Sequence, residues 1–218
     1  MEDTKRISWI DVARGICIIA IVLGHTLRNS VLRTWALSFD VPMFFFISGY
    51  CFSYKKSQIK YLEKKVRSIV IPYFCFSIFS ILLFGMAGKA LPSIRSVVEC
   101  NIISNICVMI YGNSKPDVMK YNSPLWFLPC FFVVTVVGLA LEILVRKSQN
   151  HRKMRMSIIV ILALLGEIVA SYSSIRLPWH AETAISMLVW YEIGIHCRKS
   201  TGKLRTINQK LKKTRLFF

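Results

Sequence analysis

Apolar residues along the chain collect into blocks that are separated by short polar and basic segments. Most blocks approach the length of about 20 residues that a helix needs to cross a bilayer. The pattern predicts six transmembrane helices, at residues 9–28, 36–54, 66–88, 125–145, 157–173 and 181–197. A weaker segment at 94–111 is interrupted by polar side chains and favours an interfacial or re-entrant helix.

The expected fold is therefore an all-α, polytopic transmembrane helix bundle over residues 1–197, followed by a basic tail at 198–218. Composition supports it, because 54% of the 218 residues are apolar and the mean hydropathy is +0.49. The net charge is +18, a value that nucleic-acid-binding proteins also reach. The charges lie in the gaps between apolar blocks, where a membrane protein meets anionic lipid. We therefore expect the lipid bilayer, and not nucleic acid, as a partner.

Lys and Arg residues also predict the orientation, because basic segments near the ends of spans stay in the cytoplasm. With a cytoplasmic N-terminus and six alternating spans, 21 of the 29 Lys and Arg residues lie inside and seven lie outside. The prediction is a multi-pass protein of the cell membrane with both ends of the chain in the cytoplasm.

The first predicted span contains Asp11, Arg14 and His25, and charged groups within a span are candidates for function. Arg14 and His25 are eleven residues apart, which brings them within about 20° of each other on one helix face, with roughly 16 Å between them. Asp11 precedes Arg14 at i,i+3 spacing. Alternatively, Asp11 and Arg14 form a helix-end salt bridge, and His25 makes an ordinary hydrogen bond between helices. The residues alone leave both interpretations open.

Asp40 lies near the outer end of the second predicted span, at a depth expected to match that of His25. A carboxylate beside an imidazole fixes its tautomer and raises its basicity, as a general base requires. Pro42 is expected to break the helix near Asp40, and Ser48-Gly49 to let another backbone approach closely. The alternative is an Asp40 exposed at the level of the lipid headgroups.

Lys64 and Arg67 precede the third predicted span at i,i+3 spacing, which places both cations on one face and suits phosphate. Ordinary basic flanking of a span is the alternative. Three acidic residues within spans could each neutralise a basic partner in the bundle: Glu142, Glu167 and Glu192. Three aromatic residues fit interfacial belts: Trp126, Trp179 and Tyr191.

Several motifs together resemble acyltransferase family 3, whose integral-membrane members move acyl groups, usually acetyl, from acyl-CoA onto sugars and other envelope molecules. Ile10-Asp11-x-x-Arg14-Gly15 and Val22-Leu23-Gly24-His25 resemble the opening of the family and its Arg-x10-His signature. The stretch 41–50 resembles the second-helix motif. Lys64-x-x-Arg67 with Ile71-Pro72-Tyr73 resembles the third motif, which usually has two arginines.

Two later stretches extend this resemblance. Ser123-Pro124-Leu125-Trp126-Phe127-Leu128 resembles the family's Trp-containing helix start. Leu177-Pro178-Trp179 through Tyr191-x-x-Gly194 is similar to the fucose 4-O-acetylase-like branch, which often has His where this chain has Asp40. The motifs follow the family order from residue 10 to 194. Family members have about ten spans, so the resemblance also suggests a chain truncated at its C-terminus.

The resemblance implies a donor, an acceptor and a set of site residues. Arg14, Lys64 and Arg67 would hold the phosphates of acyl-CoA, with acetyl-CoA the expected donor and no metal required. His25, paired with Asp40, would deprotonate an acceptor hydroxyl or relay the acyl group. The acceptor would be a carbohydrate or another hydroxyl compound of the cell envelope. A transporter or lipid-binding membrane protein and an inactive truncated remnant are the alternatives.

Overall fold

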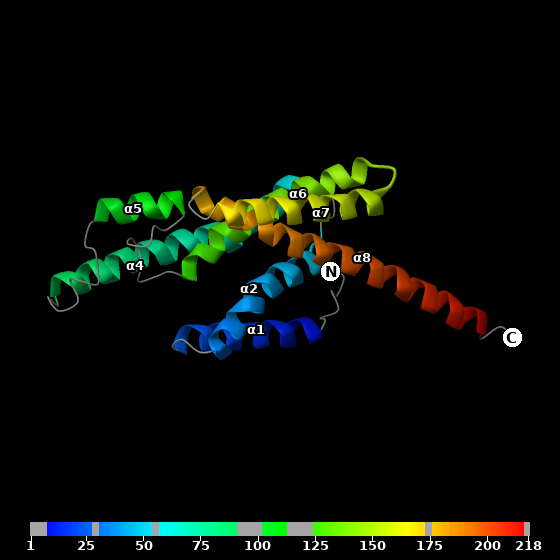
Figure 1. Cartoon of the computed structure of the whole chain (residues 1–218), viewed down its shortest axis with the longest axis horizontal. Coiled ribbons are helices and arrows are strands. Elements are labelled where there is room, and N and C mark those ends of the chain that lie inside the picture. The colour runs from blue at the N-terminus through cyan, green and yellow to red at the C-terminus, as the bar shows by residue number, and fades with distance from the viewer. Residues whose placement is uncertain are drawn as a thin grey trace. The chain divides into compact units, whose positions relative to one another are not determined.

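The computed structural model describes residues 8–27, 31–53, 57–90, 102–112, 124–172 and 176–215. Regular structure in these ranges is helical and contains no strand, which confirms the predicted all-α class. The chain divides into two compact units, one of Met1–Ser53 with Met187–Phe218 and the other of Tyr54–Ser186 (Figure 1). We name them unit 1 and unit 2.

Four of the described helical segments are long and apolar enough to cross a membrane, judged by length and composition. They are Ser8–Thr26, Val31–Tyr50, Gln58–Ala87 and Pro124–Lys147. Helices also form at the two other predicted spans, 157–173 and 181–197, but they are not among these four segments. The count of six is therefore approximate, and the crossing of the membrane by these two helices stays a prediction.

Unit 1 is built on a helical hairpin of α1 (Ser8–Thr26) and α2 (Val31–Tyr50), which lie side by side in Figure 1. At one end of the hairpin, the rings of Trp9 and Tyr50 meet edge to face with centroids 5.0 Å apart. At the other end, Gly24 makes room for the side chain of Leu37. These contacts join α1 and α2 near both ends of the hairpin.

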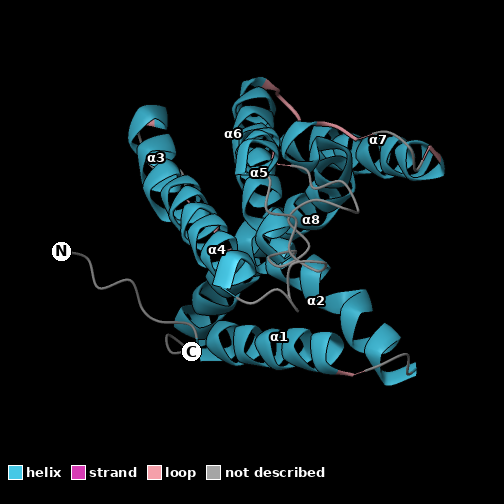
Figure 2. Cartoon of the chain, turned by 90° about the vertical axis from the view of Figure 1, so that its left-hand side faces the viewer, coloured by secondary structure: helices cyan, strands magenta, loops and turns pink. Residues whose placement is uncertain are grey.

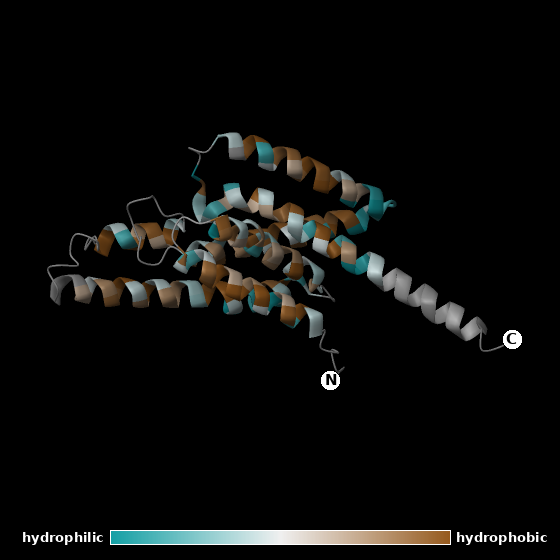
Figure 3. Cartoon of the chain, turned by 60° about the horizontal axis from the view of Figure 1, so that its bottom comes forward, coloured by the Kyte–Doolittle hydropathy of each residue, from teal (hydrophilic) through white to brown (hydrophobic). Residues whose placement is uncertain are grey.

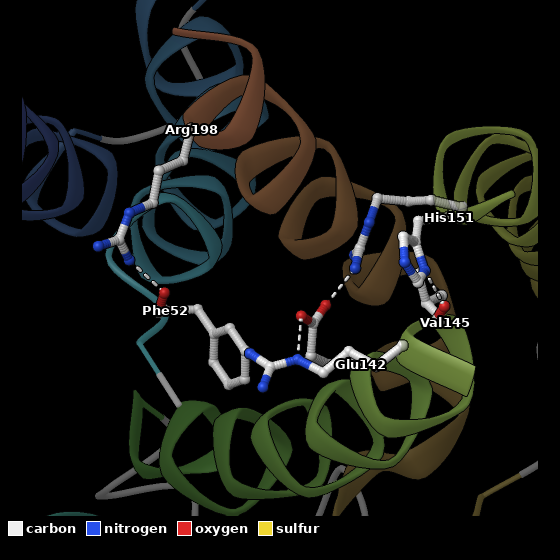
Figure 4. Close-up of polar contacts among 7 residues, drawn as sticks. Phe52, Glu142, Val145, His151 and Arg198 are labelled. Carbon is white, nitrogen blue, oxygen red and sulfur yellow. Dashed lines mark hydrogen bonds and ion pairs between the residues drawn. The ribbon is translucent and has the colours of Figure 1, made fainter. Parts of the chain in front are cut away.

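The later part of α8 (Ala181–Arg215) packs on α2 within unit 1. Gly49 and Gly194 allow the two backbones to touch, since a Cβ on either glycine would collide with main-chain atoms of the facing helix. This confirms the close approach predicted at Ser48-Gly49. Beyond the end of α2, the guanidinium of Arg198 donates to the carbonyl of Phe52 (Figure 4).

The start of α2 and the effect of Pro42 differ from the predictions. The helix begins at Val31 and not at residue 36, so that Arg33 lies in its first turn. It also continues through Pro42, which was expected to break it. Within lipid the backbone must satisfy its own polar groups, so a membrane helix continues past a proline where neighbouring groups compensate. Next to the proline, the Asp40 side chain also accepts from the main-chain N–H of Val41.

Unit 2 contains a continuous helical rod of α3 (Gln58–Lys65), the π-helical turn η1 (Val66–Val70) and α4 (Ile71–Ala90), seen in Figure 2. The rod begins eight residues before the predicted span at 66–88. The helix α5 (Ile102–Tyr111) packs on α4, where the hydroxyl of Tyr73 donates to the carbonyl of Met109 over 2.8 Å. Part of the weak segment predicted at 94–111 is thus helical, and residues 94–101 lie outside the described ranges.

The helices α6 (Phe127–Lys147) and α7 (His151–Ser171) form a second hairpin in unit 2. Asn150 caps α7 by accepting from the N–H of Lys153 over 3.2 Å, so α7 begins earlier than the predicted 157. Figure 3 shows polar residues at the turn between these helices and mostly apolar residues along α7. The 3-10 turn η4 (Pro178–His180) then leads into α8.

Candidate functional site

The helix α1 carries two of the predicted site residues, Arg14 and His25, and both side chains are exposed. His25 makes no hydrogen bond to another residue that the structure describes, and it interacts electrostatically with Asp40. This disfavours the interpretation of His25 as a satisfied hydrogen-bonding residue between helices. An exposed imidazole can accept the proton of an incoming hydroxyl.

Asp40 lies in the middle of α2 and is buried, with 1% of its surface exposed. The interpretation of Asp40 as an exposed headgroup-level residue is therefore wrong. Asp40 follows Val31 by nine residues, so it lies about 14 Å along α2 and not near the start of this helix, where the predicted span placed it. One carboxylate oxygen accepts from Val41, and the other has no hydrogen-bond partner among the described residues. A direct hydrogen bond to His25 is absent there, so their catalytic pairing stays a prediction.

Arg14 lies close to the cysteine that follows α2. Its Nη2 is 3.9 Å from Sγ of Cys51, and both side chains are exposed. The guanidinium is thus accessible to a charged ligand at this end of unit 1.

The other two predicted cofactor-binding residues, Lys64 and Arg67, lie together in unit 2. They line a cleft of about 490 Å³ with Lys60, Glu63 and Ser68. Three cations against one carboxylate give this cleft a net positive charge. All five lining side chains are exposed, so the cleft is open to solvent. A bound phosphate compound would meet cationic donors and a hydroxyl.

Local sequence explains how this cleft forms. Ser57 caps α3 by accepting from the N–H of Lys60, which fixes where the helix begins. Lys60, Lys64, Arg67 and Ser68 follow at i, i+4, i+7 and i+8, the spacing of a single helix face. Arg67 and Ser68 lie in the π-helical turn, a feature frequent at functional sites. Lys60 and Ser68 were not among the predicted residues, although this spacing could have indicated them.

Glu142 proves to be structural, as the sequence suggested for acidic residues within spans. Its carboxylate accepts from Arg146 over 2.9 Å and from Arg155, which lies on α7 (Figure 4). Glu142 and Arg155 are buried, with side chains 1% and 2% exposed. At the adjoining turn, a ring nitrogen of His151 lies within hydrogen-bonding distance of the carbonyl of Val145. These contacts tie α6 to α7 and give Glu142 the basic partners that the sequence suggested.

The other two acidic residues within the predicted spans, and the aromatic residue Tyr191, have different surroundings. Glu167 is exposed on α7, and Glu192 is buried within α8. Tyr191 is fully buried, with its ring 6.0 Å from that of Phe52, so the interfacial-belt interpretation of Tyr191 is wrong. The close approach of α2 to α8 explains this burial.

Comparison with known proteins identifies the lineage. A family model described as an acyltransferase domain matches residues 7–218. The chain belongs to acyltransferase family 3. Comparisons with curated proteins and with solved structures find no match. With its long apolar helices, the protein is thus a membrane acyltransferase.

Within this acyltransferase, the predicted site residues fall into two groups. Unit 1 holds Arg14, His25 and Asp40, and unit 2 holds Lys64 and Arg67. His25 and Asp40 interact electrostatically without a hydrogen bond between them, and Lys64 and Arg67 line one cleft. The matched region of the family model contains both groups.

Proposed function

We propose that this acyltransferase moves an acyl group, chiefly acetyl, from acyl-CoA to a hydroxyl of a cell-envelope carbohydrate. The acceptor class follows from the resemblance of its later motifs to the fucose 4-O-acetylase-like branch. The protein would act in the cell membrane with both ends of the chain in the cytoplasm, as the distribution of Lys and Arg predicts. The cleft of unit 2 lies in a segment predicted to be cytoplasmic, the side from which acyl-CoA arrives.

The cleft lined by Lys60, Lys64 and Arg67 carries this proposal. CoA is a polyanion, and cations that surround a cleft repel one another unless an anion neutralises them. Each charge-assisted contact to a phosphate contributes on the order of 1.5–3 kcal/mol. Arg67 can bind a phosphate through two parallel N–H donors, whereas the lysines act as point charges. Arg14 is a further phosphate ligand by its sequence motif, and it belongs to unit 1.

His25 supplies the chemistry in this proposal. Its neutral imidazole takes the proton of the acceptor hydroxyl as the hydroxyl oxygen attacks the thioester carbonyl carbon. The carbon–sulfur bond then breaks, and the departing CoA sulfur takes the proton from His25. The products are an ester of the acceptor and free CoA. Asp40 acts through its charge, because it favours the protonated imidazole that forms during attack.

Titration of CoA into the purified chain in nanodiscs tests the cleft. Replacement of Arg67 by Ala is expected to weaken CoA binding by roughly tenfold or more, with a larger loss at low salt. Glu63→Gln is expected to tighten it, since a repulsive carboxylate is removed from the same cleft. Arg152→Ala, an exposed cation on α7, is the control and should leave the affinity unchanged. Equal affinities for all four proteins would overturn the proposal.

A further inference from the structure

A second polar cluster lies at the start of α8, formed by residues that the proposed chemistry does not use. Nδ1 of His180 is 3.5 Å from one carboxylate oxygen of Glu182. The other oxygen of Glu182 accepts from the main-chain N–H of Leu177 over 3.0 Å, which fixes the carboxylate in place. This is an imidazole oriented by a carboxylate, the arrangement in which a histidine side chain has a defined tautomer.

The backbone that carries His180 is strained. Trp179 and His180 both lie in the left-handed region, with φ of 57° and 53°. This conformation is uncommon for residues other than glycine and is energetically unfavourable. Strain of this kind gathers at binding sites and active sites, where the surrounding structure maintains it.

The neighbouring end of α5 maintains this conformation. The indole N–H of Trp179 donates to the carbonyl of Ile110 over 3.0 Å. Gly112 has no side chain and a φ of 68°, and a Cβ there would stand 2.7 Å from the Trp179 ring. The hydroxyl of Tyr111 donates to the carbonyl of Arg176 over 2.7 Å. Trp179 thus anchors the turn inside unit 2, a role beyond that of an interfacial belt.

The second ring nitrogen of His180 is left for a ligand. Nε2 is buried and has no hydrogen-bond partner among the described residues. Burial lowers the pKa of His180, and nearby Arg176 lowers it as well, while Glu182 opposes them. The ring is thus neutral at physiological pH, and an Nδ1–H directed at Glu182 leaves a lone pair on Nε2. The imidazole also lies against the half-buried ring of Trp126, with centroids 5.3 Å apart.

We propose that His180 and Trp126 form a binding site for a neutral hydroxyl compound with an apolar face, such as a sugar ring. A hydroxyl of the ligand would donate to Nε2, and its carbon–hydrogen face would pack on Trp126. An anion would meet the lone pair on Nε2 and the carboxylate of Glu182, while the nearby cation Arg176 would attract it. A neutral hydroxyl compound donates to Nε2 without that repulsion. We assign this site to the acceptor of the transfer reaction, and this assignment rests on the proposed function.

Nitrogen NMR of histidine tests the site in the wild-type chain, because it reads the buried Nε2 directly. Selective ¹⁵N labelling of histidine, with His180→Asn and His151→Asn as assignment variants, separates the two resonances. In nanodiscs, methyl β-D-glucopyranoside should shift the Nε2 resonance of His180, which gains a hydrogen bond, and leave that of the exposed His151 unchanged. Sodium acetate at equal concentration should shift neither resonance. No shift for His180 with the glycoside, or an equal shift with acetate, would overturn the proposal.

Replacement of His180 by Phe keeps a ring beside Trp126 and removes the acceptor nitrogen. Quenching of tryptophan fluorescence by the same glycoside should then require about tenfold higher concentration, the loss expected for one hydrogen bond. His151→Phe is the matched control and should bind as wild type does. If CoA fails to bind but the glycoside binds through His180, the proposed function fails and the site stands. If CoA binds and the glycoside does not, the proposed function stands and the site at His180 fails.

Discussion

Gly49 of α2 lies directly against the main chain of Tyr191 in α8, and a Cβ at residue 49 would stand 1.9 Å from the Tyr191 carbonyl oxygen. The contact is reciprocal, because a Cβ at Gly194 would stand 2.2 Å from the carbonyl oxygen of Phe46. Small residues at facing positions let membrane helices associate closely, where van der Waals packing is a principal attractive force. Unit 1 therefore depends on two glycines for its closest contact.

Replacement of Gly49 by Ala should destabilise the protein. The added methyl group meets backbone atoms that cannot rotate away, and such overpacking costs about 1–3 kcal/mol. Gly15→Ala is the control on α1, since a Cβ at residue 15 meets nothing within 4 Å. It should be neutral or slightly stabilising through its higher helix propensity. Thermal unfolding in detergent measures both, and equal midpoints for the two variants would contradict the packing.

The two partners of Glu142 offer a second test within one cluster. Arg155 is 2% exposed and Arg146 is 48% exposed. Arg155→Ala removes the buried basic partner of the Glu142 carboxylate. It should lower the free energy of unfolding by about 3–5 kcal/mol. Arg146→Ala removes a surface partner and should cost no more than about 1 kcal/mol. Unfolding experiments that give the same loss for both variants would show that burial does not govern this cluster.

The hydrophobic pattern predicted most of the helices, because their apolar blocks match the length of a membrane crossing. It did not find the start of α2, which begins at Val31 and not at residue 36. The predicted span at 36–54 leaves Arg33 outside the helix. In the structure Arg33 lies within the helix, and its side chain donates to the carbonyl of Gly24 over 3.0 Å. Such a contact between two helices has no counterpart in local sequence.

The candidate site, too, could be predicted only where it depends on local sequence. Lys64 and Arg67 could be predicted as a pair, because i,i+3 spacing is a local property of a helix. The burial of Asp40 and the partner of Glu142 on α7 depend on which helices pack together, so the sequence alone does not specify them. The π-helical turn at 66–70 and the left-handed turn at Trp179 are also outside the reach of simple periodicity.

The stability of the protein should depend on pH through His180. Burial holds the pKa of His180 below its ordinary value of about 6.5 in the folded state. The unfolded chain therefore binds a proton more readily, and this contribution to stability is present above pH 6.5 and lost as the pH falls through the folded pKa. His180→Asn removes the titrating group, and asparagine tolerates the left-handed backbone. Between pH 7.5 and 5.5, the melting temperature of the wild type should fall more than that of the variant. Parallel decreases would contradict the prediction.

The predicted orientation can be tested at the turn between α6 and α7. Residues 146–155 carry five basic side chains, so this turn is expected in the cytoplasm. Asn150→Cys, with the native cysteines replaced, should react with a membrane-impermeant maleimide only after the cells are opened. Modification of residue 150 from outside intact cells would reverse the proposed topology.

Arg14 can be tested through the thiol beside it. A phosphate bound to the Arg14 guanidinium would cover Cys51, because Nη2 and Sγ are only 3.9 Å apart. Adenosine 3′,5′-bisphosphate carries phosphate at the same two ribose positions as CoA and has no competing thiol. It should therefore slow alkylation of Cys51 by N-ethylmaleimide. Cys107 on α5 is also exposed and should react at an unchanged rate. Arg14→Ala should abolish the protection, since the anion loses a cationic donor at this position. Protection that persists in Arg14→Ala would assign the effect to another group and remove Arg14 from the proposed donor site.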